Sequence, residues 1–331
     1  MSGEPQVSVI ACVYNAEKTF GATLDCLFGS EWKVPFEVIV VDDASTDSTR
    51  ELCGRYDTKV IALKENVGPA RARNVGIEES SGAILLFVDS DVLFPPDLIG
   101  RMLKAMEADP ALSGVGSISS PTPLNPGFYS RYFALQEYLI LSESRKLRGT
   151  PQAVGICTRL GTMRREVFEV LGGFNEAIRD PSVEDGEFSL RMRGKYFVDW
   201  PEDFENEHYF PDSLGKIWRR YHLNTKEYAW ALRRLGIKDT SAFQEDTRAR
   251  FLLGLAGIFL LISMWTPWAL VGVAVLICGA VFVKRKLFGL LLGEEDAMFC
   301  VKGALVYAVT SVPIASGLVA SLIYPAPQPK G

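Results

Sequence analysis

Short apolar runs alternate with helix-like segments over the first ninety residues of the chain. The runs are Val7–Val13, Phe36–Val41, Lys59–Leu63 and Ala83–Val88. Each has the length and composition of a buried strand. Apolar residues recur at helical spacing over Ala16–Phe28, and further helical segments are expected over 47–55 and Pro69–Ser80. This alternation predicts an α/β fold with a doubly wound, mostly parallel sheet and flanking helices.

The C-terminal part of the chain has a different pattern. No charged residue occurs from Phe251 to Val283, a stretch of about 50 Å as one helix against a hydrocarbon core of about 30 Å. Thr266-Pro267 interrupts it between two tryptophans, and basic residues precede and follow it. This pattern predicts a hairpin of two membrane spans over about 251–283, with a re-entrant hairpin as the alternative. A second apolar stretch predicts a third span over about 303–324.

The domain organisation expected is therefore a catalytic body over 1–240 and a multi-pass membrane region over 251–324. The net charge of the chain is -5, and the body carries the negative excess. Nucleic acid is not expected as a partner, because phosphate backbones require a basic footprint. The six cysteines form no C-x-x-C pair, which is typical of a reducing compartment. No signal-peptide pattern opens the chain, so we expect the body on the cytoplasmic side of the inner membrane.

Polar residues follow three of the predicted strands at the point where each strand ends. Tyr14-Asn15 follows the first, Asp42-Asp43 the second, and Asp89-Ser90-Asp91 the fourth. Ligands of parallel α/β sheets bind at the carboxyl ends of the strands. Two carboxylates one residue apart repel each other, and Mg²⁺ or Mn²⁺ would relieve the repulsion and attract a diphosphate. The alternative for Asp89 and Asp91 is a polar strand end that caps the next helix.

Several motifs in a fixed order carry a resemblance to a known family. They are Val7–Ile10 through Tyr14-Asn15, Asp42-Asp43-Ala44-Ser45-Thr46-Asp47, Asn66-Val67-Gly68 with Ala70–Gly76, Asp89-Ser90-Asp91, Gly172–Glu176 and Glu184-Asp185. Together they resemble the family 2 glycosyltransferases, which have a GT-A fold. The resemblance covers about residues 10–210, and it implies transfer of a sugar from a UDP- or GDP-sugar with Mn²⁺ or Mg²⁺ as cofactor.

The resemblance also implies roles for individual residues on the donor side. Tyr14 would stack on the base, with Asn15 beside it, and Asp43 would accept a hydrogen bond from a base N–H. Asn66 and Gly68 would form a turn that lets the backbone approach the nucleotide closely. The remaining donor-side candidates are Arg71 or Arg73 at the phosphates, and Ser90. Structural alternatives are a core-edge tyrosine, a capping aspartate and basic residues on a helix surface, and the sequence does not decide which arginine faces the site.

Asp185 is the candidate base, because transfer to a hydroxyl requires removal of its proton. The resemblance implies this role and inversion of the anomeric configuration, with Glu184 orienting the loop or acceptor. Acidic residues that begin a helix are the alternative for this pair. The metal site is expected to include Asp89, Asp91 and His208, although a lone histidine is more often structural.

The sequence therefore predicts a membrane-anchored, metal-dependent, inverting glycosyltransferase. An intact Glu184-Asp185 pair favours a hydroxyl on a lipid-linked or envelope glycan as acceptor. One alternative is a polyprenyl-phosphate glycosyltransferase, whose anionic acceptor needs no base. Another is a non-catalytic membrane scaffold of a glycan-assembly complex, which would have no need of the self-repelling carboxylates.

Overall fold

A computed structural model describes residues 4–145, 155–156, 158–181, 183–236, 252–253, 256 and 269–323 of the 331-residue chain. The chain divides into two compact units. The first contains Met1–Leu124 and Ile140–Tyr209, and the second contains Asn125–Leu139 and Phe210–Pro325.

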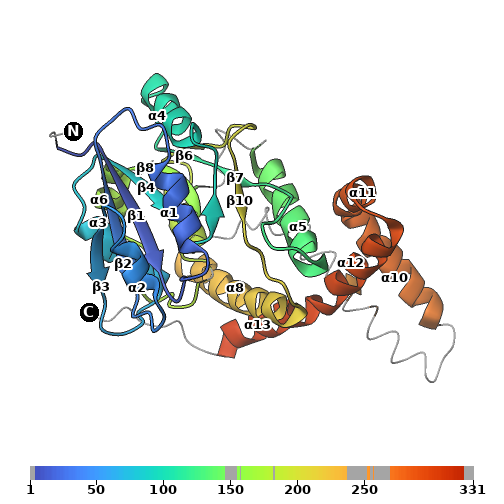
Figure 1. The fold of residues 1–331 in the computed structure, drawn as a ribbon. Coiled ribbons are helices and arrows are strands. Elements are labelled where there is room, and N and C mark those ends of the chain that lie inside the picture. The colour runs from blue at the N-terminus through green and yellow to red at the C-terminus, as the bar shows by residue number, and fades with distance from the viewer. Residues whose placement is uncertain are drawn as a thin grey trace. The chain divides into compact units, whose positions relative to one another are not determined.

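A seven-stranded sheet forms the centre of the first unit (Figure 1). Its order is β3 (Lys59–Ala62), β2 (Phe36–Asp42), β1 (Val7–Val13), β4 (Ile84–Val88), β8 (Leu160–Arg164), β6 (Gly114–Gly116) and β9 (Val198–Asp199). The four strands predicted from the N-terminal pattern are confirmed and are parallel, whereas β8 runs antiparallel to both β4 and β6. A smaller sheet has the order β5 (Val92–Leu93), β10 (Glu205–His208) and β7 (Ile118–Ser119).

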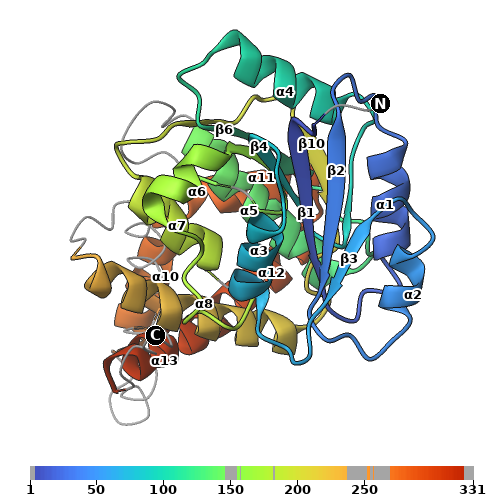
Figure 2. The same ribbon diagram turned by 90° about the vertical axis from the view of Figure 1, so that its left-hand side faces the viewer.

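Helices cover both faces of the seven-stranded sheet, as the alternating pattern predicted (Figure 2). On one face, a core of buried side chains joins the sheet to α1 (Phe20–Phe28), α2 (Thr49–Cys53) and α4 (Leu98–Ala108). On the other face lie α3 (Pro69–Glu78), α6 (Arg165–Leu171) and α7 (Glu184–Met192). The carboxyl ends of β1, β2 and β4 are thereby left accessible at one edge, next to the start of α3.

Helices make up the described part of the second unit. They are the first turns of α5 (Phe128–Arg145), then α8 (Leu214–Arg234), α10 (Ala269–Val283), α11 (Arg285–Glu294), α12 (Ala297–Val309) and α13 (Ser311–Ile323). Tyr132 of α5 is buried in one apolar cluster with Leu287 and Leu291 of α11 and Tyr307 of α12. The cluster explains why the aromatic residues of α5 recur at helical spacing.

One helix of the described residues, Ala297–Ile323, is long and apolar enough to cross a membrane by length and composition. It comprises α12 and α13, which meet at Thr310. Of the hairpin expected over 251–283, the structure describes α10 and residues 252, 253 and 256, and the connection between the two expected spans lies outside the described residues. The hairpin, the span over 303–324 and the domain limits at 240 and 251 therefore stay predictions.

Candidate active site

Two carboxylates and an imidazole meet beyond the end of β4. Asp89 and Asp91 lie between β4 and β5, and His208 ends β10. The antiparallel pairing of β10 with β5 places His208 opposite Val92, so its Nε2 lies 3.2 Å from Oδ1 of Asp91. One ligand atom from each of Asp89, Asp91 and His208 lies within 4.8 Å of the other two. The three residues proposed as metal ligands are thus brought together.

Arg73 is the arginine of α3 that faces the site. Its side chain is 8% exposed, and its guanidinium bridges Oδ1 of Asp89, at 2.9 Å, and Oε1 of Glu184. Burial by itself lowers the pKa of Arg73, but the two carboxylates outweigh burial and raise it, so the guanidinium stays charged. Asp89, Asp91 and His208 are called the metal-competent cluster below. Arg73 is a buried counter-charge that connects this cluster to Glu184-Asp185.

Arg71 points to a different environment, although it is only two residues away. Its side chain is 38% exposed and pairs at 3.0 Å with both Glu78 and Glu176. Residues two apart on a helix do not share a face. The choice that the sequence left open is thus decided in favour of Arg73, and Arg71 belongs to a surface ion-pair network.

Glu184 and Asp185 occupy the first turn of α7 and differ in their surroundings. Glu184 is paired with Arg73, whereas Oδ1 of Asp185 accepts a hydrogen bond from the backbone N–H of Gly186 at 2.7 Å. Burial, and next the charge of Glu184, raise the pKa of Asp185 to about 7. A carboxyl group with such a pKa exchanges a proton near neutral pH, which suits a general base.

Burial also affects the other groups below the carboxyl edge of the sheet. It raises the pKa of Asp89 above its ordinary value, against the opposing charge of Arg73. It raises the pKa of the Cys12 thiol to about 12, so this side chain at the end of β1 stays neutral. Negative charge at this edge is therefore concentrated on the carboxylates, where a cation would be stabilised most.

Asp43 organises the loop that precedes α3. Its carboxylate accepts hydrogen bonds from the backbone N–H groups of Val67 and Gly68, at 2.8 and 2.9 Å, and the Asn66 amide donates to its carbonyl oxygen. Gly68 has a φ of +87°, and a Cβ there would lie 2.1 Å from the carbonyl oxygen of Arg179. The predicted turn over Asn66 and Gly68 is present, and Asp43 holds it in place.

The other donor-side candidates line the same edge of the sheet. Tyr14 follows β1 with 51% of its surface exposed, as a base-stacking side chain requires. Asn15 instead fastens the neighbouring loop, since its Oδ1 accepts a hydrogen bond from the Thr46 backbone at 2.8 Å. Ser90 is half-buried between the two aspartates.

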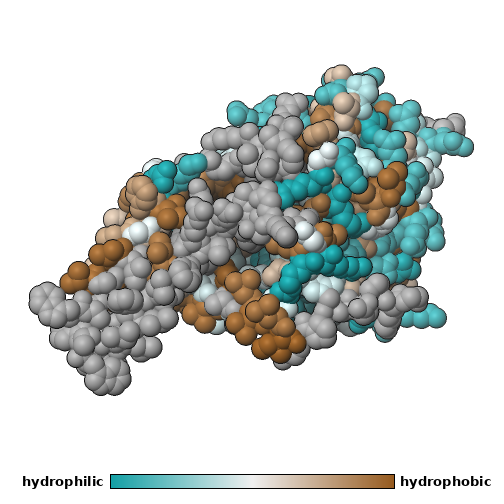
Figure 3. All heavy atoms as spheres, turned by 180° about the vertical axis from the view of Figure 1, so that it is seen from behind, coloured by the Kyte–Doolittle hydropathy of each residue, from teal (hydrophilic) through white to brown (hydrophobic). Residues whose placement is uncertain are grey.

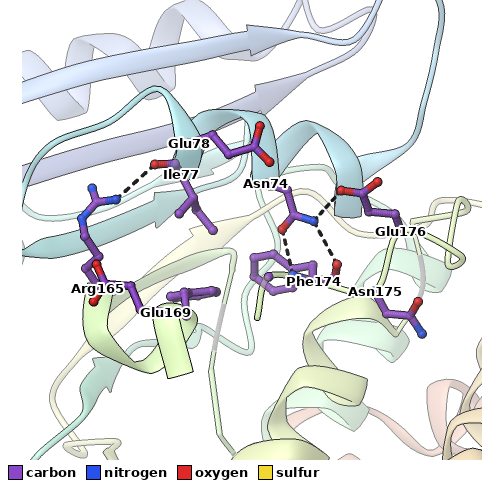
Figure 4. Close-up of a pocket in the computed structure, with 10 residues that line it drawn as sticks. Asn74, Ile77, Glu78, Arg165, Glu169, Phe174, Asn175 and Glu176 are labelled. Atoms are coloured by element: carbon purple, nitrogen blue, oxygen red, sulfur yellow. Dashed lines mark hydrogen bonds between the residues drawn. The ribbon is translucent and has the colours of Figure 1, made fainter. Parts of the chain in front are cut away.

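Asn74, the last polar residue of the A-R-N motif, fixes the G-G-F-N-E segment to α3 (Figure 4). Its amide accepts from the backbone N–H of Phe174 at 2.8 Å and donates to the Phe174 carbonyl and to Glu176, both at 2.9 Å. A Cβ on Gly173 would lie 2.4 Å from Oδ1 of Asn74, which explains a glycine at that position. The cavity of about 500 Å³ in Figure 4 lies beside this contact, between α3 and α6.

Arg159 is a charged residue of the site that sequence reasoning missed. The backbone N–H of Asp89 donates to the Arg159 carbonyl at 2.8 Å, and the charge of Arg159 acts on Asp89. The position follows from the antiparallel pairing of β8 with β4. No motif marks Arg159, because the alternating pattern of the N-terminal half gives no sign of an antiparallel strand from residue 160.

Comparison with solved structures defines the class of the fold as GT-A glycosyltransferase. The mannosyltransferase PcManGT from Pyrobaculum calidifontis, solved with GDP-Man and Mn²⁺, aligns with a TM-score of 0.60 at 21% identity, over 97% of this chain and 88% of that one. Glucosyl-3-phosphoglycerate synthase from Mycobacterium tuberculosis aligns with a TM-score of 0.51 at 20% identity, over 71% and 82% of the two chains.

Sequence comparison then gives the family. The family model "Glycosyl transferase family 2" matches residues 8–172, and this part of the chain belongs to that glycosyltransferase family. An uncharacterized glycosyltransferase of Haemophilus influenzae is 29% identical over 56% of this chain and 61% of its own length. The Escherichia coli glucosyltransferase WfaP is 29% identical over 38% and 56%, and Staphylococcus aureus TarS is 42% identical over 25% and 16%. The chain thus matches less than two thirds of the length of each of these relatives.

Proposed function

We propose that this protein transfers a sugar from a nucleotide diphosphate sugar to a hydroxyl group, with a divalent metal and with inversion at the anomeric carbon. The observation that carries the proposal is the link through Arg73. This one guanidinium contacts both Asp89 of the metal-competent cluster and Glu184, the neighbour of Asp185. A site for the donor diphosphate and a candidate base for the acceptor are therefore adjacent.

Asp89, Asp91 and His208 are the residues that would hold the metal. Two carboxylates and one imidazole are a mixed oxygen and nitrogen donor set, which suits Mn²⁺ better than Mg²⁺. When bound, the metal would offset the negative charge that builds on the leaving nucleotide. Arg159 and the donor-side residues Asn66, Gly68, Arg73 and Ser90 are assigned to the nucleotide, with Tyr14 stacking on the base and Asp43 accepting from it.

Asp185 would take the proton of the acceptor hydroxyl as the new glycosidic bond forms. Its raised pKa supports this role, because a base with a pKa of about 7 both ionises near neutral pH and accepts a proton well. Attack from the side opposite the nucleotide inverts the anomeric configuration. Glu184 is paired with Arg73 and would orient the loop rather than accept a proton.

The acceptor proposed is a lipid-linked or envelope glycan at the cytoplasmic face of the inner membrane. The relative WfaP transfers glucose to a diphosphoundecaprenol-linked sugar, and the relative TarS transfers N-acetylglucosamine to poly(ribitol-phosphate). The apolar helix Ala297–Ile323 supports attachment to a membrane. The limits proposed remain a catalytic body over 1–240 and a membrane region over 251–324, with multi-pass topology as a prediction.

Calorimetric titration of the detergent-solubilised chain with UDP and with GDP, each with and without Mn²⁺, tests the donor site. We expect metal-dependent binding of one nucleotide, lost in Asp91→Ala and retained in Glu78→Ala, a surface variant remote from the metal ligands. Folded protein that binds neither nucleotide would contradict the transferase proposal and favour the scaffold. Binding that needs no metal would refute the role assigned to Asp89, Asp91 and His208.

A further inference from the structure

The helix Ala297–Ile323 has an apolar outer face that no described part of its unit covers. Side chains three, four or seven positions apart are between 41% and 62% exposed: Met298, Val301, Leu305, Val309, Val312 and Val319. We call these six residues the outer stripe. Hydrophobic side chains gather in brown over the surface that the C-terminal helices form (Figure 3). An apolar stripe of this length indicates contact with an apolar partner.

The inner face of the same helix packs along α8, which Figures 1 and 2 show beside α13. Nδ1 of His222 lies 2.8 Å from Oγ of Ser316, and Nη1 of Arg233 donates to Oγ of Ser321 at 3.2 Å. A Cβ on Gly317 would lie 2.5 Å from the carbonyl oxygen of His222. Because these residues of α13 are small or polar, α13 packs directly against the backbone of α8.

The charged residues of α8 make it unfavourable for α8 to enter the hydrocarbon core of a membrane together with α13. Over Leu214–Arg234 it carries a single acidic residue, Glu227, and six basic ones: Lys216, Arg219, Arg220, Lys226, Arg233 and Arg234. Charged side chains within the bilayer core are costly and rare. If α13 crossed the core while it kept its contacts with α8, it would carry several of these charges into the core.

Apart from Ala297–Ile323, no helix in the described part of the chain is both long and apolar enough to cross a membrane. With α13 held on α8, only the 13 residues of α12 are free to enter the core. Thirteen residues span about 20 Å, against a core of about 30 Å. The 15 residues described in α10 span about 22 Å.

We propose that α12 and α13 lie in the plane of the membrane, with the outer stripe inserted into the boundary between head groups and acyl chains. The partner is the surface of a bilayer that contains anionic lipids. Lys302, which is exposed on α12, and the basic residues of α8 supply the complementary charge. This arrangement replaces the predicted span over 303–324 and is independent of the reaction proposed for the first unit.

Depth measurements along the outer stripe separate the two arrangements. Spin labels are attached at Val301→Cys, Val312→Cys and Val319→Cys in turn, in a full-length chain whose natural cysteines are replaced, reconstituted in phosphatidylglycerol vesicles. Glu51→Cys on α2 is the aqueous reference. In-plane helices give three equal, shallow depths. A spanning helix places residue 312 near the bilayer centre, roughly 16 Å along the axis from residue 301, and this result would overturn the proposal.

Sidedness gives a second test that keeps the natural cysteines. Gly293→Cys, at a position with open space around it, and Gly331→Cys flank the helix. A membrane-impermeant maleimide is applied to intact and to inverted vesicles, and each adduct is identified by peptide mass. Labelling of both cysteines from the same side is expected. Labelling from opposite sides means that the helix crosses the membrane, whatever the topology of residues 251–283.

Discussion

Two arginines of α3 offer a matched test of how burial sets the value of an ion pair. Arg71 and Arg73 belong to the same helix, and each forms ion pairs with two carboxylates. They differ in exposure, which is 38% for the Arg71 side chain and 8% for that of Arg73. We expect Arg73→Met to destabilise the protein severely and Arg71→Met to leave its stability nearly unchanged.

The magnitudes follow from what each substitution leaves behind. Removing Arg73 leaves Glu184 buried and Asp89 half-buried without their counter-charge, and breaking a buried pair in this way costs about 3–5 kcal/mol. Removing Arg71 leaves two solvated glutamates, and an exposed pair contributes about 0–1 kcal/mol. At about 2–4 °C per kcal/mol for a domain of this size, Tm should fall by roughly 6–20 °C in the first variant and by no more than about 4 °C in the second.

Thermal unfolding of the full chain in detergent, followed by tryptophan fluorescence, measures both shifts. Adding Glu184→Gln to the Arg73→Met variant should restore part of the lost Tm, because it neutralises one orphaned carboxylate. The loss should also shrink as the pH is lowered, since burial raises the pKa of Asp89, and a protonated Asp89 no longer needs a counter-charge. Equal shifts for the two arginine variants, or no recovery in the double variant, would refute this reasoning.

Three further outcomes are expected. Asp185→Asn should lower sugar transfer by about 10²–10⁴-fold while nucleotide binding is retained. The activity of the wild-type protein should fall as the pH drops below about 7, because the base is then protonated. A transfer rate that does not change from pH 5 to pH 8 would rule out Asp185 as the base. His208→Ala should weaken Mn²⁺ binding, followed by electron paramagnetic resonance, by about tenfold or more, whereas His222→Ala should not; equal effects would remove His208 from the metal site. Gly68→Ala should lower Tm, since its Cβ would meet the Arg179 carbonyl oxygen at 2.1 Å, and an unchanged Tm would show that the loop yields.

The sequence was sufficient to predict the strands and helices of the first ninety residues. The runs that became β1, β2 and β4 are mostly apolar because these inner parallel strands are buried on both faces, whereas the edge strand β3 is only partly buried. Strand period and helix period are local properties, so they can be read without knowing the partners of each element. The polar residues at the strand ends follow for the same reason, since parallel strands bring their carboxyl ends to one edge.

Contacts between distant parts of the chain decided the rest of the site. His208 reaches Asp91 through the pairing of β10 with β5, and Arg159 reaches Asp89 through the antiparallel pairing of β8 with β4. No local pattern encodes which strands become neighbours when 70 or more residues separate them, as they separate Asp89 from Arg159. Likewise, the letters of A-R-A-R-N are equally compatible with either arginine facing inward, and only the docking of α3 on the sheet fixed its rotation.

The C-terminal helices show the same division between local and tertiary information. Length and hydropathy by themselves determined that Ala297–Ile323 is an apolar helix compatible with a membrane. Its packing on α8, through Ser316, Gly317 and Ser321, is a tertiary contact that hydropathy does not register. Hydropathy measures how favourably a segment transfers into lipid. The orientation of that segment in the membrane, across it or in its plane, depends on the charged helix α8 against which it packs.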